Sequence, residues 1–183
     1  MKKVLAVVGS PRHGGNTDLL VDSFVEGARA GGAATEKVFL ADLSIAPCDG
    51  CRACATTHEC CIDDDMTPLY GKLESSDAWV LGTPVYFWGP TAQFKAFLDR
   101  WEVYDDEERL RVKGKEVVLI SPFGDDDPHT AHGIIFMLEK TAAWLRLSFR
   151  HQILVTALDK GEVANNPTAL KQAYDLGKAL AAG

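Results

Sequence analysis

A chain of 183 residues with 46% hydrophobic and 25% charged residues suits one globular domain with a substantial core, so we expect a single domain over residues 1–183. The net charge of −7 and the lack of any basic run argue against nucleic acid as a partner, because a phosphate backbone is bound by fields of Lys and Arg. The first apolar run, Val4–Val8, is far shorter than the roughly 20 residues that cross a bilayer and is too short for a signal peptide. We therefore expect a cytoplasmic protein with no membrane partner.

Short apolar segments alternate along the chain with segments of helical periodicity. Leu19, Leu20, Phe24 and Ala28 recur at helical spacing after the first apolar run, and Gly31-Gly32 ends that helix. In chain order the sequence predicts a strand at 3–8, the helix just described, a strand at 36–40, a cysteine-rich segment at 48–61, a helix at about 65–75, a strand at 77–82, a helix at about 91–104, a strand at 116–120, a helix at 131–147, a strand at 152–156 and a helix at 167–181.

This alternation predicts a doubly wound α/β sandwich, because parallel strands need crossover connections that place helices on both faces of the sheet. In such sheets the ligand lies outside the carboxyl ends of the strands, near the switch in strand order. The loops after the first, third and fourth strands are therefore the candidate binding loops.

The loop after the first strand is rich in small and hydroxyl residues and leads into a helix. It fits neither the Walker pattern nor the G-x-G-x-x-G dinucleotide pattern. Ser10, Asn16 and Thr17 can donate hydrogen bonds, Arg12 can neutralise charge, and backbone N–H groups at a helix N-terminus favour phosphate. The alternative is a plain turn in which Asn16 or Thr17 caps the helix.

The loop after the third strand exposes an apolar and aromatic run between two prolines. Val85, Tyr86, Phe87 and Trp88 must pack against something, either the core, a second subunit or a planar ligand. Backbone groups of such a loop could bind the polar edge of a flavin while its side chains cover the rings.

Three segments resemble the NADPH-dependent FMN reductase family of flavodoxin-like proteins: G-S-P-R-x-x-G-N-T from Gly9, G-T-P-V-Y-F-W-G from Gly82 and F-K-A-F-L-D-R from Phe94. The resemblance implies a three-layer sandwich whose five-stranded parallel sheet has the order 2-1-3-4-5. It implies homodimers or homotetramers, and FMN with its phosphate at Ser10, Arg12, Asn16 and Thr17, its isoalloxazine at Pro84, Val85, Tyr86, Phe87 and Trp88, and a weaker third contact at Ser121, Phe123 and Gly124. Lys95 and Arg100 are interpreted as structural or interfacial.

All five cysteines lie within residues 48–61. In a reducing compartment such a cluster is typical of metal binding or redox chemistry. Cys48, Cys51, Cys54 and Cys60 resemble the C-x2-C-x2-C-x5-C motif of the iron-sulfur flavoprotein branch of this family, which implies a 4Fe–4S cluster on those four thiolates. Zinc on the same ligands, a thiol–disulfide pair at Cys48/Cys51 or Cys51/Cys54, and free thiols remain alternatives. Cys61 is interpreted as a spare, and His58 as a possible substitute ligand.

The resemblance implies an FMN-dependent oxidoreductase of the NAD(P)H:flavin or quinone reductase type. A reductase of quinones or nitroaromatics is a further alternative, which the aromatic loop after the third strand would permit. The flavin carries the chemistry, so no catalytic acid or base is expected from the protein. A 4Fe–4S cluster would couple the flavin to one-electron partners. The alternative is a non-enzymatic FMN electron carrier that receives electrons from ferredoxin-like partners.

Overall fold

The computed structural model describes residues 1–127 and 129–183, and all of their side chains except that of Asp106. Its sheet contains five strands, all paired in parallel in the order β2-β1-β3-β4-β5. The strands are β1 Lys3–Val8, β2 Ala34–Phe39, β3 Ala78–Gly82, β4 Glu116–Phe123 and β5 Ser148–Thr156. The predicted fold class and strand order are confirmed.

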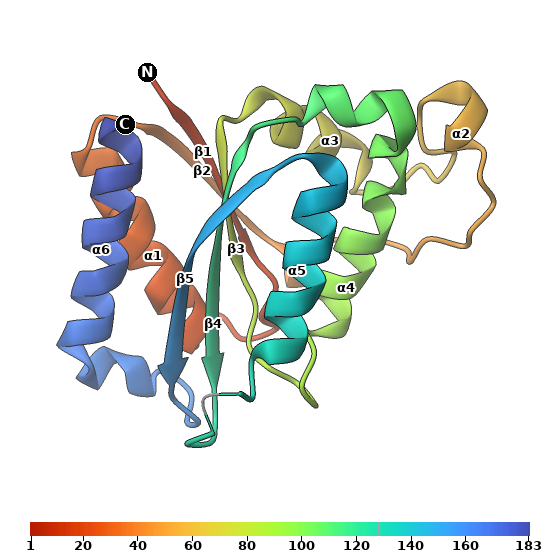
Figure 1. The fold of residues 1–183 in the computed structure, drawn as a ribbon. Helices are drawn as coiled ribbons and strands as arrows, with labels where there is room; N and C mark the ends of the chain where they lie inside the picture. The colour runs from red at the N-terminus through yellow and green to blue at the C-terminus, as the bar shows by residue number, and fades with distance from the viewer. Residues whose placement is uncertain (128) are drawn as a thin grey trace.

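Helices cover both faces of this sheet (Figure 1). The α-helices are α1 Asn16–Ala30, α2 Cys54–Thr57, α3 Thr67–Ser75, α4 Ala92–Asp99, α5 His132–Leu145 and α6 Pro167–Ala182, and the 3-10 helices are η1 Leu40–Asp42, η2 Arg100–Tyr104, η3 Asp106–Arg111 and η4 Glu162–Asn165. Within the described residues, none of these helices is both long and apolar enough to span a bilayer.

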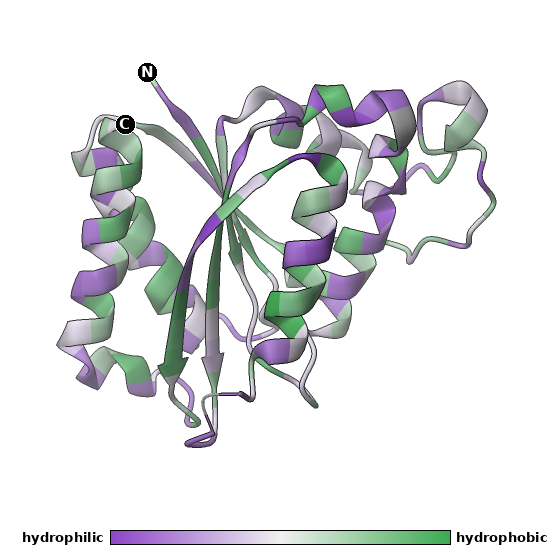
Figure 2. Ribbon diagram, viewed as in Figure 1, coloured by the Kyte–Doolittle hydropathy of each residue, from purple (hydrophilic) through white to green (hydrophobic). Residues whose placement is uncertain are grey.

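The core is divided by the sheet into two apolar layers. Alternate residues of β1 point to opposite faces, so Val4, Ala6 and Val8 pack under α1 and α6 while Leu5 and Val7 pack under α3, α4 and α5. In Figure 2 the hydrophobic residues of these helices face the strands and the hydrophilic ones face outward. Both faces of the sheet are therefore buried, as parallel sheets require.

The structure differs from the sequence-based prediction mainly at the ends of elements. β2 and β5 begin before the predicted positions, in residues that are mostly half-buried or exposed and so lack an apolar pattern. The helix predicted for 91–104 ends at Asp99 and continues as the 3-10 helix η2. The cysteine-rich segment contains the short helix α2, which stands at the edge of the molecule (Figure 1).

Candidate functional site

The carboxyl ends of β1, β3 and β4 are tied together by hydrogen bonds between their loops. The N–H of Gly9 donates to the carbonyl oxygen of Gly82 at 2.7 Å, and the N–H of Thr83 donates to the carbonyl oxygen of Ile120 at 3.0 Å. Thr91 is fully buried, donates its hydroxyl to the Gly9 carbonyl and caps α4. The loops after β1 and β3 are thus tied to each other and to the carboxyl end of β4.

A cavity of about 170 Å³ opens at this edge. Nine of the predicted FMN residues line it, namely Ser10, Arg12, Asn16, Thr17, Pro84, Val85, Tyr86, Phe123 and Gly124. Gly15, Pro122, Ala157, Leu158 and Lys160 complete the lining. Phe87, Trp88 and Ser121 are not among the lining residues. Ser121 is instead fully buried in β4, and its Oγ has no hydrogen-bond partner.

The loop after β1 offers donors to an anion. The N–H groups in the first turn of α1 have no intrahelical acceptor, and the helix dipole makes this end positive. The Oγ of Ser10 is buried and accepts from the N–H of Arg12 at 3.1 Å, so its own proton remains free to donate. Arg12 is exposed beside it. These groups can surround a phosphate.

The side chain of Asn16 has a structural role. Its Nδ2 donates to the carbonyl oxygens of Ala157 and Asp159 at 3.1 and 2.8 Å, and its Oδ1 accepts from the N–H of Val163 at 3.1 Å. Asn16 therefore fixes the loop after β5 against the start of α1. Its contribution to an anion would come from the backbone N–H.

Because of this attachment, the cavity is also lined by a basic residue that was not predicted from the sequence. Lys160 lies in the loop after β5 and lines the cavity together with Arg12. The signal was present in the sequence, because β5 is also a parallel strand whose carboxyl end must lie at the same edge.

Asp18 lies in the first turn of α1, next to the loop after β1, and forms its polar contacts within the protein. Its carboxylate accepts from the N–H of Gly14 at 2.7 Å and forms an ion pair with Lys37, which also pairs with Asp22. Burial alone would lower the pKa of Lys37, but the hydrogen bonds and charges of the two aspartates raise it above its ordinary value. Asp18 is thus paired within the protein, and Arg12 and Lys160 are the basic side chains among the residues that line the cavity.

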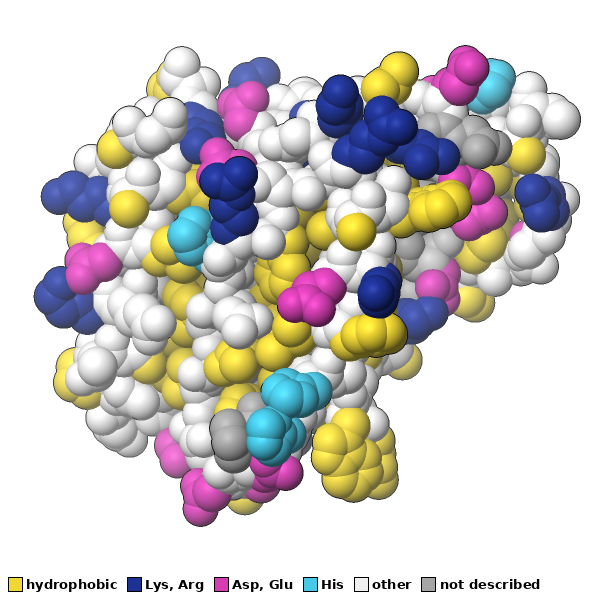
Figure 3. Space-filling model, in the orientation of Figure 1, with side chains coloured by type: hydrophobic (Ala, Val, Ile, Leu, Met, Phe, Trp, Pro, Cys, Tyr) yellow, Lys and Arg dark blue, Asp and Glu magenta, His cyan; other side chains and the backbone are white. Residues whose placement is uncertain are grey.

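The loop after β3 ends in a tight hairpin. Tyr86 and Gly89 exchange two backbone hydrogen bonds, of 2.8 and 3.1 Å, across a turn in which Phe87 and Trp88 have φ of 47° and 61°. The left-handed region costs a residue with a side chain about 1–3 kcal/mol, and such strain is common at ligand sites. Phe87 is 96% exposed and Trp88 66% exposed. Figure 3 shows hydrophobic side chains that protrude from the lower edge of the molecule.

The five cysteines lie around a second cavity of about 340 Å³. Its lining comprises Cys48, Asp49, Gly50, Cys51, Arg52, Cys54, Cys60, Cys61, Ile62, Asp99, Arg100, Glu102 and Val103. The Sγ atoms of Cys51 and Cys61 are 3.4 Å apart, so Cys61 belongs to this group although the motif does not include it. Burial, followed by the charges of Glu102 and Cys60, raises the pKa of Cys54, which is the opposite of the environment that activates a nucleophilic cysteine.

Arg100 fastens the cysteine-rich segment to the body of the protein. The residue is 2% exposed, and its guanidinium donates to Ala46 O at 2.9 Å, Ile62 O at 3.0 Å and Asp64 Oδ2 at 2.7 Å. Burial would raise the pKa of Asp64, but the hydrogen bonds from Arg100 and from backbone N–H groups hold it below its ordinary value. Arg100, predicted to be structural or interfacial, is one of the residues lining the cysteine cavity.

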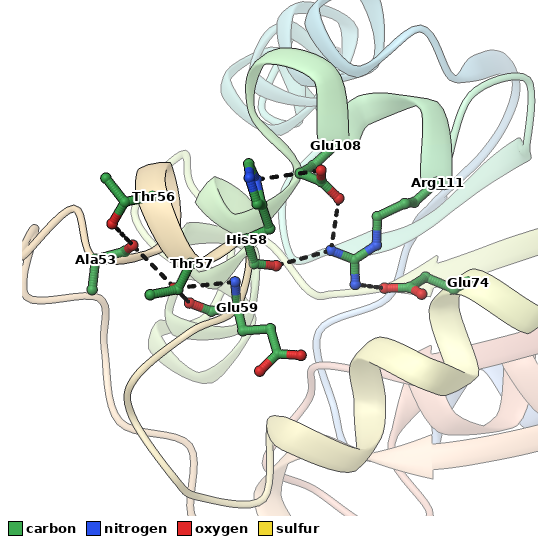
Figure 4. A network of polar contacts seen from close by, with 8 residues as sticks. All are labelled: Ala53, Thr56, Thr57, His58, Glu59, Glu74, Glu108 and Arg111. Atoms are coloured by element: carbon green, nitrogen blue, oxygen red, sulfur yellow. Dashed lines mark hydrogen bonds and ion pairs between the residues drawn. The ribbon is translucent and has the colours of Figure 1, made fainter.

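A second network holds the outer end of the segment (Figure 4). Arg111 donates to the carbonyl oxygen of His58 at 3.1 Å and pairs with Glu74 and Glu108. The His58 Nδ1 lies 3.3 Å from Glu108 Oε1. His58 lines a neighbouring acidic cavity and is not one of the residues lining the cysteine cavity.

The two cavities lie at opposite ends of α4. Thr91, at the N-terminus of α4, touches the loop after β1, whereas Asp99 and Arg100 at its C-terminus line the cysteine cavity. Eight helical residues span about 12 Å. Among the described residues, none lines both cavities.

Comparisons with known proteins identify related sequences and folds. The sequence profile of the NADPH-dependent FMN reductase family matches residues 2–134. An iron-sulfur flavoprotein of Methanocaldococcus jannaschii is 42% identical over 98 residues, which are 54% of this chain and 51% of that protein, so the match spans about half of that relative. An iron-sulfur flavoprotein of Archaeoglobus fulgidus is 32% identical over 180 residues, covering 98% of this chain and 79% of that protein.

Among solved structures, an FMN-dependent NADH-azoreductase from Bacillus anthracis in complex with FMN superimposes with a TM-score of 0.74 at 15% identity, covering 98% of this chain and 100% of the other. This likeness supports the flavodoxin-like fold. The profile match covers well over half of the sequence and includes the loops after β1, β3 and β4. The chain therefore belongs to the NADPH-dependent FMN reductase family.

Proposed function

We propose that this protein is an FMN-dependent oxidoreductase that takes electrons from NAD(P)H. The observation that carries the proposal is the cavity at the carboxyl edge of the sheet, which combines an anion-binding helix terminus with an apolar loop in a member of this family. When bound, FMN supplies the hydride and electron chemistry. The protein would then bind, orient and shield it.

The lining residues fit the two ends of an FMN molecule. Ser10, Arg12, Thr17 and the N–H of Asn16 would hold the phosphate, with Lys160 as a second positive charge. Pro84, Val85 and Tyr86 would lie along the isoalloxazine, with Phe123 and Gly124 opposite. The lining lends no support to the predicted contacts of Phe87, Trp88 and Ser121 within one chain.

The flavin is identified by releasing it from purified protein and separating FMN from FAD and riboflavin by chromatography. Turnover is then measured as steady oxidation of NADPH or NADH with free FMN or a quinone as acceptor. Bound FMN with acceptor-dependent turnover is expected. A protein that binds no flavin even after incubation with excess FMN would refute the proposal.

We further propose that the cysteine cavity holds a 4Fe–4S cluster on Cys48, Cys51, Cys54 and Cys60. All four thiols line this one cavity of about 340 Å³, and two relatives with this chain's type of sequence are named iron-sulfur flavoproteins. Four thiolates are the ligand set of such a cluster, which exchanges single electrons when bound.

Anaerobic purification, followed by iron and acid-labile sulfide assays and a visible spectrum, tests the cluster. About four iron and four sulfide per chain are expected. Zinc in place of iron, or flavin bands alone after anaerobic reconstitution, would refute this part and leave the FMN proposal standing.

A non-enzymatic FMN carrier is the second candidate. The observation that favours it is the pair of exposed rings, Phe87 and Trp88, beside the cavity, since exposed aromatic groups are typical of surfaces that dock a protein. The docked protein would be an electron donor or, as in the predicted homodimer or homotetramer, a second copy of this chain. Reduction by ferredoxin without turnover of NAD(P)H would favour the carrier.

A further inference from the structure

One buried nitrogen at the cysteine cavity has no partner within the protein. In the described part of the chain, only three buried side-chain nitrogen or oxygen atoms lack a hydrogen-bond partner, and the Nε of Arg100 is one of them. Leaving a buried donor unsatisfied costs about 1–3 kcal/mol, and more when the group is charged. Arg100 lines the cavity where the thiols gather, so an acceptor in that cavity would remove the cost.

The other nitrogens of the same guanidinium hold both ends of the cysteine-rich segment. Ala46 precedes Cys48, and Ile62 follows Cys61, so one planar group closes the loop that carries every thiol. The backbone of Arg100 is held as well, because Tyr70 OH donates to its carbonyl oxygen at 3.1 Å. The guanidinium is thus fixed in position before any ligand enters.

We propose that Arg100 is a positioning residue for a metal–thiolate centre, closing the cysteine-rich segment around the centre and donating its Nε–H to a sulfur atom there. The inference rests on the proposed function only in that the cavity holds such a centre. The acceptor is a thiolate sulfur or an inorganic sulfide.

The chemistry of the centre explains why a buried cation belongs beside it. Four thiolates bring four negative charges into a partly buried cavity, and hydrogen bonds to the sulfurs of a cluster help to set its reduction potential. A fixed N–H donor stabilises the more negative, reduced state and so raises the potential. The cysteines that line the cavity together with Arg100 are the candidate acceptors.

The competing interpretation is that Arg100 only holds the cysteine-rich segment in place, and Arg111 provides the control for it. Arg111 also binds a carbonyl oxygen of the segment, that of His58, and two carboxylates, but it is not one of the residues lining the cysteine cavity. Arg100→Lys and Arg111→Lys are therefore matched: each keeps a positive charge and loses a planar fork, and only the first removes a donor at the cavity.

The first measurement uses Cd²⁺ alone as the probe. The full-length, thiol-reduced, iron-free protein is titrated with Cd²⁺ and followed by thiolate-to-metal absorbance. Arg100→Lys should weaken Cd²⁺ binding by about 10- to 100-fold, as loss of an outer-shell partner does. Arg111→Lys should leave it within twofold, and the FMN content of each variant reports folding. Equal Cd²⁺ affinities in Arg100→Lys and the wild type, or no Cd²⁺ binding by the wild type, would overturn the inference.

The second measurement uses the iron-loaded protein. At a fixed potential the ratio of reduced to oxidised cluster should fall about tenfold in Arg100→Lys, which is a 59 mV lower potential for a one-electron couple. An unchanged potential overturns the inference and leaves the cluster itself in place. A wild type that holds Cd²⁺ but no iron would refute the cluster and not the role of Arg100.

The third measurement needs no variant and so survives a substitution that does not fold. In wild-type protein with ¹⁵N-labelled arginine, one slowly exchanging Nε–H resonance should shift on loading with Cd²⁺. If every arginine Nε–H resonance is unmoved by saturating Cd²⁺, the hydrogen bond to sulfur is absent and the inference fails.

Discussion

Replacing Gly177 with alanine should destabilise the protein, because α6 contacts α1 too closely at this point for a side chain. A Cβ at position 177 would lie 2.1 Å from the carbonyl oxygen of Phe24 and 3.0 Å from the nitrogen of Ala28, whereas ordinary contacts begin at 3.4 Å. The helices would have to separate by about 1 Å or more. Overpacking of this kind costs about 1–3 kcal/mol, and the higher helix propensity of alanine returns less than about 1 kcal/mol.

The expected net loss of about 1–2 kcal/mol corresponds to a fall in Tm of about 2–8 °C for a domain of this size. Gly71→Ala is the matched control, since Gly71 lies within α3 and its Cβ would meet nothing within 4 Å. There alanine should stabilise by about 0.5–1 kcal/mol. Thermal and urea unfolding, followed by circular dichroism, measure both. If Gly177→Ala is as stable as the wild type or more stable, the close approach inferred for the two helices is wrong.

Three further predictions concern the cavity edge and its surroundings. Arg12→Ala and Lys160→Ala should each weaken FMN binding severalfold, most strongly at low salt, whereas Lys171→Ala, an exposed position on α6, should leave FMN binding unchanged. If fluorescence titrations show the same effect for all three variants, the assignment of Arg12 and Lys160 to the FMN phosphate is wrong. Trp88→Gly should raise the free energy of unfolding by about 1 kcal/mol, because glycine adopts positive φ without strain. A lower free energy of unfolding in this variant would contradict the inferred backbone strain at Trp88. Lys37→Gln should reduce stability at neutral pH. Because the folded pKa of Lys37 lies above 10.5, that deficit should vanish only as pH rises through the raised value, which urea unfolding from pH 7 to 11 can follow.

The fold was predictable wherever a segment's own pattern decides its structure. Val4–Val8 is apolar at every position and is followed by Gly9-Ser10-Pro11, which together favour a short strand buried on both faces. The strand order followed from the family resemblance. The beginnings of β2 and β5 escaped prediction because edge strands leave half of each residue exposed and so carry polar side chains there. The 3-10 helix η2 escaped because a 3-10 turn preserves much of the helical spacing.

The candidate site was predictable in its local parts and not in its distant ones. In the loops after β1 and β3 the residues that suggest ligand binding lie within a few positions of one another in the sequence, and most of these predicted side chains line the cavity. Lys160 lies 148 residues from Arg12 in sequence, and only the shared carboxyl edge of the sheet brings them together. Arg100 likewise meets Ala46 and Asp64 through the docking of the cysteine-rich segment on α4, which no spacing in the sequence reveals.

The position of α4 links the two sites mechanically. Its N-terminus is capped by Thr91, whose hydroxyl also donates to the Gly9 carbonyl oxygen at the start of the loop after β1. Its C-terminus continues directly into Arg100. Phe94 and Phe97 are fully buried between these points, so the helix cannot rotate or slide without opening the core. The separation of the two cavities within one chain is therefore set by a packed helix rather than by a flexible loop.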